Sequence, residues 1–212
     1  MNMSQSLKVN ALGIGAFSAI TAALIALTFV YTKAPIEENI RQQKSAKLFE
    51  IIDQQTIDND VFSDSMVIDG SPLGYNQDIT IHFGTHNGEV KTVIFPVLTS
   101  QGYSGDISLL VGINYDQSVA GVRVISHTET PGLGDKLELK KSSWLLAFNG
   151  KSATDKTRWA VKKDGGDFDQ FTGATITPRA VVQAVSNSLA FFKENQQQLI
   201  NDFKSGSYKN DN

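Results

Sequence analysis

Cysteine is absent from all 212 residues of this chain. Its absence excludes disulfides, thiolate-bound iron–sulfur clusters and zinc, thioether-linked haem and thiol nucleophiles. An excess of positive charge is absent as well, because 19 Lys and Arg stand against 22 Asp and Glu, a net charge of −3 without a basic run. We therefore expect no nucleic-acid partner. Cysteine usage leaves the compartment open, since a chain without thiols is compatible with oxidising and reducing surroundings.

The common catalytic signatures are also missing. There is no P-loop, no Gly-x-Gly-x-x-Gly fingerprint and no Gly-x-Ser-x-Gly elbow, for which Gly102–Gly105 has the wrong spacing. His82 and His86 have a spacing that binds metals on a helix, but they fall across a predicted strand and turn. We assign no catalytic residue and no metal site, and we do not expect a stand-alone catalyst.

One long stretch near the N-terminus carries no charge. It runs for 24 residues, from Val9 to Thr32, and as a helix it would be roughly 30 Å long or more, the thickness of a hydrocarbon core. A buried helix of a soluble protein is usually shorter. A cleaved signal peptide has a shorter apolar core and then a small-x-small site, which residues 27–31 do not provide. We predict an uncleaved transmembrane helix over residues 9–32.

The flanking charges leave its orientation open. Lys8 precedes the span, and four bases follow it: Lys33, Arg41, Lys44 and Lys47. A simple positive-inside count would place the C-terminal side in the cytoplasm, but large domains translocate largely regardless of charge.

The rest of the chain, residues 33–212, has the pattern of one globular unit. Apolar residues at helical spacing predict an amphipathic juxtamembrane helix over residues 35–53, and Thr177 and Pro178 are placed to cap and begin a terminal helix. Alternating and β-branched runs predict strands at 79–83, 90–98, 107–115, 119–126 and 158–162. The fold class predicted is α+β: a single N-terminal transmembrane helix followed by one mixed α/β domain.

Two segments combine small, stiff and polar residues. Residues 127–134, His-Thr-Glu-Thr-Pro-Gly-Leu-Gly, are typical of a turn, yet Gly132 and Gly134 would also let the backbone approach a flat ligand. Residues 169–178 are typical of a capped helix start, but a helix N-terminus is also a site for a phosphate group. The residues alone leave both alternatives open.

The second segment resembles a known signature. Asp169-x-x-Thr172-Gly173-Ala174-Thr175 is similar to the Asp-x-x-(Ser/Thr)-Gly-Ala-Thr motif of proteins that receive FMN through a phosphoester bond to the last threonine. Along essentially the whole chain, the order of these features resembles the RnfG family of Rnf electron transport complexes: first the apolar span, then Gly102–Gly105, then Thr130–Gly134, and last the motif. The NqrC family of the sodium-pumping NADH:quinone oxidoreductase shares these motifs but is typically longer, and it is the alternative family.

The resemblance implies specific roles. One FMN would be attached covalently to Thr175 by a flavin transferase that uses FAD and Mg²⁺ and releases AMP. The remaining recognition residues would be Asp169, Thr172, Gly173 and Ala174. The isoalloxazine would be lined by Glu129, Thr130, Pro131, Gly132, Leu133 and Gly134, with Gly102–Gly105 as a nearby loop.

The resemblance also implies a place and partners. Residues 1–8 would be cytoplasmic and residues 33–212 a periplasmic FMN-binding domain, on a single-pass protein of the inner membrane. The chain would carry electrons between other membrane subunits of an ion-translocating complex. The competing hypothesis is a membrane-tethered binding or assembly module without redox activity, in which the motif match is accidental.

Overall fold

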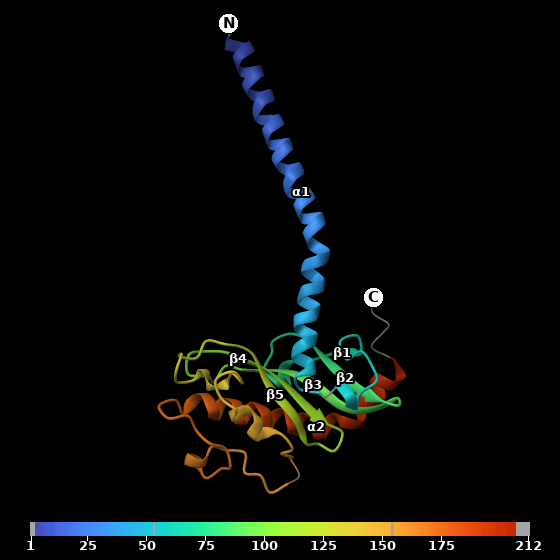
Figure 1. Cartoon of the computed structure of the whole chain (residues 1–212), viewed down its shortest axis with the longest axis vertical. Helices are drawn as coiled ribbons and strands as arrows, with labels where there is room; N and C mark the ends of the chain where they lie inside the picture. The colour runs from blue at the N-terminus through green and yellow to red at the C-terminus, as the bar shows by residue number, and fades with distance from the viewer. Residues whose placement is uncertain (1–2, 53, 154, 207–212) are drawn as a thin grey trace. The chain divides into compact units, whose positions relative to one another are not determined.

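The computed structural model of the chain describes residues 3–52, 54–153 and 155–206. They form two compact units, one ending at Lys44 and the other beginning at Ser45. Figure 1 shows the helices and strands of each unit.

Helix α1 (Met3–Phe49) contains the predicted transmembrane segment and residues 35–49 of the predicted juxtamembrane helix, with Pro35 in its interior. Its stretch Ala11–Lys33 is long and apolar enough to cross a membrane, by length and composition. Threonine hydroxyls along this stretch donate to carbonyls four residues earlier, as Thr21 does to Phe17 at 2.9 Å. Such bonds satisfy polar groups without water. The helix ends at Phe49, and residues 50–52 form a turn, so the predicted juxtamembrane helix extends too far; Asp53, its predicted end, lies outside the described residues.

The second unit is built on a five-stranded sheet whose neighbours are all antiparallel and follow chain order. Its strands are β1 (Ser65–Ile68), β2 (Ile79–His86), β3 (Glu89–Thr99), β4 (Ile107–Asn114) and β5 (Val119–His127). The four predicted strands that match β2 to β5 are confirmed, whereas the short edge strand β1 was not predicted. The β2–β3 turn is a two-residue turn. Asn87 and Gly88 alone form it, both with positive φ, as in type I′ hairpins.

Alternation along the central strands divides the sheet into two buried faces. On β3, Val93 and Phe95 face the larger core, while Ile94 between them packs with Leu48 and Leu110 in a second cluster. The terminal helix α2 (Ile176–Ser205) covers the first face, where the Phe192 ring lies edge-on to Phe95 at 5.8 Å. Figure 1 shows α2 running across the sheet.

Between β5 and α2 the described residues form three short 3₁₀ helices, η3 (Asp135–Leu137), η4 (Trp144–Phe148) and η5 (Lys162–Asp164). Two more, η1 (Gln54–Thr56) and η2 (Ser71–Leu73), flank β1. The prediction of a strand at 158–162 is wrong, because Val161 makes only a single bridge, to Phe168. Trp159 and Phe168 stack near Phe148, so the apolar alternation there reflects packing of a compact loop.

Phe192 tests the packing of α2 on the sheet. Its side chain is fully buried, so we expect Phe192→Ala to lower the free energy of unfolding by about 3–5 kcal/mol through lost burial and a residual cavity. Urea unfolding of the full chain in detergent, followed by tryptophan fluorescence, measures this, since both tryptophans lie in the second unit. Lys193→Ala, at the exposed neighbour, should change the value by no more than about 0.5 kcal/mol. Equal losses in both variants would contradict the packing assignment.

Candidate functional site

The predicted site residues lie on three segments that meet beside the start of α2. Antiparallel pairing of Ile107 with His127 places the loop before β4 next to the loop after β5. The hydroxyl of Thr128 then donates to the carbonyl of Ser104 at 3.0 Å. The third segment, residues 169–177, leads into α2 and contacts the second through Glu129. The sheet and α2 therefore bring together residues that are far apart in sequence.

Glu129 connects all three segments. Its side chain is 4% exposed, and its Oε1 accepts a hydrogen bond from the Ser104 amide at 2.9 Å. Its Oε2 accepts one from the hydroxyl of Thr177, which is fully buried. The prediction that Thr177 caps the helix is therefore wrong: Thr175 occupies the N-cap position, and the Thr177 hydroxyl is used by a carboxylate 48 residues earlier.

Two glycines pack tightly around this carboxylate. A Cβ at Gly134 would lie 2.8 Å from both Cβ and Oε2 of Glu129, and one at Gly102 would lie 2.8 Å from its Oε1. Gly134 is buried, so close packing on Glu129 accounts for its lack of a side chain. Gly132 is different, because it is exposed, has a φ of +78° and has open space where a Cβ would be.

The loop from Thr130 to Asp135 is held in a compact turn. The amides of Leu133 and Gly134 both donate to the carbonyl of Thr130, at 3.1 and 3.0 Å. Pro131 lies exposed at its outer side. The turn leaves Leu133 43% exposed, and its Cδ2 lies 3.3 Å from where a Cβ of Gly173 would be. Two predicted segments are thus in contact through Leu133 and Gly173.

Charged groups fix the two ends of this loop. At one end, Lys141 donates to the buried Asp135 carboxylate at 2.9 Å, and this bond holds the pKa of Asp135 below its usual range. At the other end, the Glu129 amide donates to Nδ1 of His127, whose Nε2 lies 3.4 Å from Glu138. His127, for which the sequence pattern predicted no role, therefore holds the backbone of the loop.

The backbone of the Asp169–Thr175 segment turns sharply. The Ala174 amide donates to the Phe171 carbonyl at 3.1 Å, and the turn places Gly173 at a φ of +83°. A positive φ at the third residue of a turn favours glycine, which explains this member of the motif. Thr172 and Gly173 are exposed at its tip.

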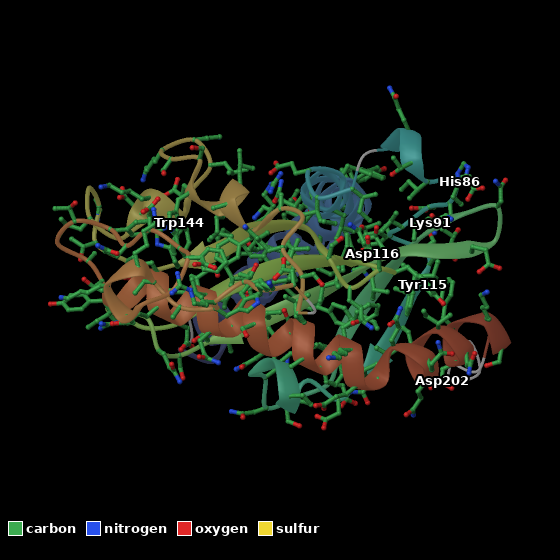
Figure 2. The ribbon with its side chains drawn as sticks, turned by 90° about the horizontal axis from the view of Figure 1, so that it is seen from below. His86, Lys91, Tyr115, Asp116, Trp144 and Asp202 are labelled. Atoms are coloured by element: carbon green, nitrogen blue, oxygen red, sulfur yellow. The ribbon has the colours of Figure 1, made fainter. Side chains whose placement is uncertain are left out.

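Trp144 anchors the beginning of the same segment. Its indole Nε1–H donates to the Asp169 carbonyl at 2.7 Å, and its ring lies edge-on to the buried Phe171 at 4.9 Å. Figure 2 labels Trp144, which lies at the end of the domain where the loops leading to α2 gather. The Asp169 carboxylate points outward, 70% exposed, and pairs with Lys162 at 2.7 Å.

Thr175 stands at the N-cap of α2 without using its side chain as a cap. It is half-buried, and its hydroxyl makes no capping hydrogen bond. The amides of Ile176 and Thr177 lie in the first turn, where no carbonyl precedes them within the helix, and Pro178 has no N–H. The hydroxyl of a half-buried threonine thus lies at the positive end of a helix 30 residues long.

Exposed apolar side chains occur on all three segments of the site. Tyr103 is 68% exposed and Ile176 is 44% exposed, in addition to Leu133. Such residues offer apolar contacts to a flat ring, and the helix terminus offers hydrogen bonds to a phosphate. The arrangement combines a threonine hydroxyl, a helix N-terminus that can bind an anion, and exposed apolar side chains beside them.

Sequence reasoning missed three residues that build this site. Thr177 was interpreted as a cap because its local pattern fits one, and no local signal points to its distant partner Glu129. Trp144 and Lys162 received no function either, because their contacts to Asp169 depend on how the 3₁₀ segments fold back.

Comparison with known proteins adds independent information. Residues 102–190 match a model of the FMN-binding domain, and residues 1–51 match one of the RnfG N-terminal region. The first of these ranges contains all three segments of the site.

Relatives match nearly the whole chain. A protein of Vibrio atlanticus, named as the G subunit of an ion-translocating oxidoreductase complex, is 40% identical over 93% of this chain and 96% of its own length. Proteins of the same name are 44% identical in Pseudoalteromonas atlantica, over 93% of each chain, and 42% identical in Shewanella loihica, over 94% and 95%. The resemblance predicted from the sequence motifs is confirmed, and the chain belongs to the RnfG family, the G subunits of ion-translocating oxidoreductase complexes.

Proposed function

We propose that this chain is a membrane-anchored electron-carrier subunit of an ion-translocating complex, with one FMN attached through a phosphoester bond to Thr175. The single observation that carries the proposal is the position of Thr175. It is the N-cap residue of α2, its hydroxyl makes no capping hydrogen bond, and it lies inside the range that matches the FMN-binding domain.

The residues around Thr175 fit a phosphate. The first-turn amide of Ile176, an exposed residue, can donate to a phosphate oxygen, and the helix dipole favours a negative charge at this end. The side chain at the first turn that carries positive charge, Arg179, is already paired with Asp164 at 2.5 Å. We assign the Ile176 amide and the helix dipole to phosphate binding.

The residues also fit an isoalloxazine ring. Leu133, Tyr103 and Ile176 supply exposed apolar surface, and Gly132 and Gly173 carry no side chain that would obstruct a flat ring. Glu129 and Gly134 are buried together, so we assign them to the support of the ring-binding loop. Thr130 and Pro131 are exposed on that loop and remain proposed contacts.

Attachment requires a second enzyme, since we assign no catalytic group to this chain. In the proposed step a flavin transferase binds FAD with Mg²⁺, and Thr175 Oγ attacks the phosphorus of the FMN half. The Oγ–P bond forms, the pyrophosphate P–O bond breaks, and AMP leaves while the hydroxyl proton is released. Asp169 and Thr172, both exposed, are available to the transferase.

When bound, FMN supplies reversible electron transfer, and the protein supplies position and surroundings. The relatives are named as subunits of a complex, so we propose that this chain exchanges electrons with other membrane subunits. We propose residues 9–32 as the membrane span, residues 1–8 as cytoplasmic and residues 33–212 as the periplasmic FMN-binding domain.

The attachment proposal predicts a fluorescent protein. Full-length chain produced with a flavin transferase should fluoresce under ultraviolet light on a denaturing gel, with an FMN-sized mass increment on the peptide that contains Thr175. Thr175→Ala should lose both signals, because no hydroxyl remains to form the phosphoester bond. Thr80→Ala, at an exposed threonine of β2, should keep them. Equal fluorescence in Thr175→Ala would exclude this attachment, and absence of flavin from every form would favour the binding or assembly module.

The orientation proposal can be tested because the chain has no cysteine of its own. A single cysteine from Lys156→Cys, at an exposed position of the second unit, should react with a membrane-impermeant maleimide in intact spheroplasts. One from Ser4→Cys should react only after the membrane is permeabilised. The unsubstituted chain is the control and should remain unlabelled. The reverse pattern would place the domain in the cytoplasm and contradict the proposal.

A further inference from the structure

Two threonines at the start of α2 have opposite surroundings. Thr175 is half-buried and makes no capping bond, whereas Thr177, two residues later, is fully buried and bonded to Glu129. The buried pair does not touch the Thr175 hydroxyl in any described contact. Its position in the first turn, however, lets it determine how that turn is held.

We propose that Glu129 is a positioning residue for the modification of Thr175, acting through its hydrogen bond to the Thr177 hydroxyl. The inference rests on the proposed attachment of FMN to Thr175. By fixing the first turn of α2, the bond holds the Thr175 hydroxyl in the direction from which it can attack phosphorus.

The first turn of a helix needs such support. Its amides lack partners within the helix, and helix ends fray when nothing holds them. The Thr177–Glu129 bond ties the turn to the loop after β5, and the bond from Ser104 to the same carboxylate ties both to the loop before β4. Gly134 and Gly102 pack so closely on Glu129 that its carboxylate has little room to move.

A purely structural role explains a buried carboxylate poorly. Burying a carboxyl group costs free energy even when its oxygens are hydrogen-bonded, and the two donors that Glu129 meets here are an amide and a hydroxyl. An apolar pair of similar volume would fill the same space without that cost. The carboxylate adds a fixed geometry, because each of its two oxygens accepts a hydrogen bond from a specific group on a different segment.

The other end of the motif is held by different contacts. Trp144 donates to the Asp169 carbonyl, and Lys162 pairs with the Asp169 carboxylate. Loss of the Thr177 bond should therefore leave the Asp169 end, which we propose the transferase recognises, in place. We therefore expect two separate contributions to flavin transfer. Binding of this chain to the transferase depends on Asp169, and reaction of the bound chain depends on the first turn of α2.

The main experiment follows flavin transfer to the full chain in detergent, with flavin transferase, FAD and Mg²⁺, as a function of acceptor concentration. Thr177→Val keeps the shape and removes the donor, and we expect kcat to fall about tenfold with an unchanged KM, because a small misplacement of a reacting group is costly. Thr177→Ser keeps the hydroxyl and should stay within about twofold of the unsubstituted chain.

Ser188→Ala is the matched control. Ser188 is another fully buried hydroxyl of α2, bonded to the Val185 carbonyl at 2.8 Å, several turns from Thr175. Ser188→Ala should leave kcat for flavin transfer unchanged, even if it lowers the melting temperature as much as Thr177→Val does. In the unmodified protein, amide hydrogen exchange over residues 172–180 should speed up in Thr177→Val and not in Ser188→Ala.

A second pair of variants keeps the test decisive if Thr177→Val does not fold. The amide of Glu129→Gln can accept from Ser104 and donate to the Thr177 oxygen, so transfer should continue, whereas Glu129→Leu should lose about tenfold in kcat. Equal loss in the Gln and Leu variants would overturn the positioning role. The positioning role would also be overturned if Thr177→Val kept the full kcat, or if Thr177→Ser or Ser188→Ala lost as much kcat as Thr177→Val.

The outcomes also separate this inference from the proposed function. If the unsubstituted chain gains FMN on Thr175 and Thr177→Val does so equally fast, only the positioning role fails. If the unsubstituted chain gains no FMN, or gains it at another residue, the proposed attachment fails and the positioning role fails with it.

Discussion

The packing of α2 against one face of the sheet is the interaction on which the rest of the domain depends. Its apolar stripe, which includes Val181, Val185 and Phe192, is fully or almost fully buried. That contact sets the direction of the helix and brings its N-terminus to the end of the sheet where β4 begins and β5 ends. The pairing of Ile107 with His127 then places two loops at the same end. The site forms because the start of β4, the end of β5 and the N-terminus of α2 lie at the same end of the domain.

The features that could be predicted from the sequence are those encoded locally. Strands β2 to β5 follow from alternation and turn residues, and the Asp169–Thr175 motif carries its own signature. Contacts between distant segments could not be predicted, because no periodicity records them. The capping prediction for Thr177 failed for this reason: a threonine before a proline resembles a cap, and only the fold shows that its hydroxyl belongs to Glu129. Likewise, the 158–162 segment alternates because of aromatic packing rather than strand pairing.

Two ion pairs lie near the start of α2. Asp164 pairs with Arg179, and Lys162 pairs with Asp169. These pairs are partly exposed and contribute little to stability. Their effect on the site is more important, since Arg179 and Lys162 are each engaged by a carboxylate. The dipole of the helix and Lys136, whose Nζ lies 6.0 Å from the centre of the Phe171 ring, remain as sources of positive potential near the motif.

The exposure of the site favours a covalent bond over simple binding. Pockets that hold a dissociable cofactor usually enclose most of its surface, whereas the apolar residues here, Tyr103, Leu133 and Ile176, lie substantially exposed on loops. A flavin held only by these contacts would dissociate readily, but one bonded to Thr175 would stay while its ring remained accessible to a redox partner. In a chain without cysteine a thiol cannot form that bond. A threonine hydroxyl at a helix N-terminus would meet both requirements, because it would supply the nucleophile and a stabilising position for the proposed phosphodiester.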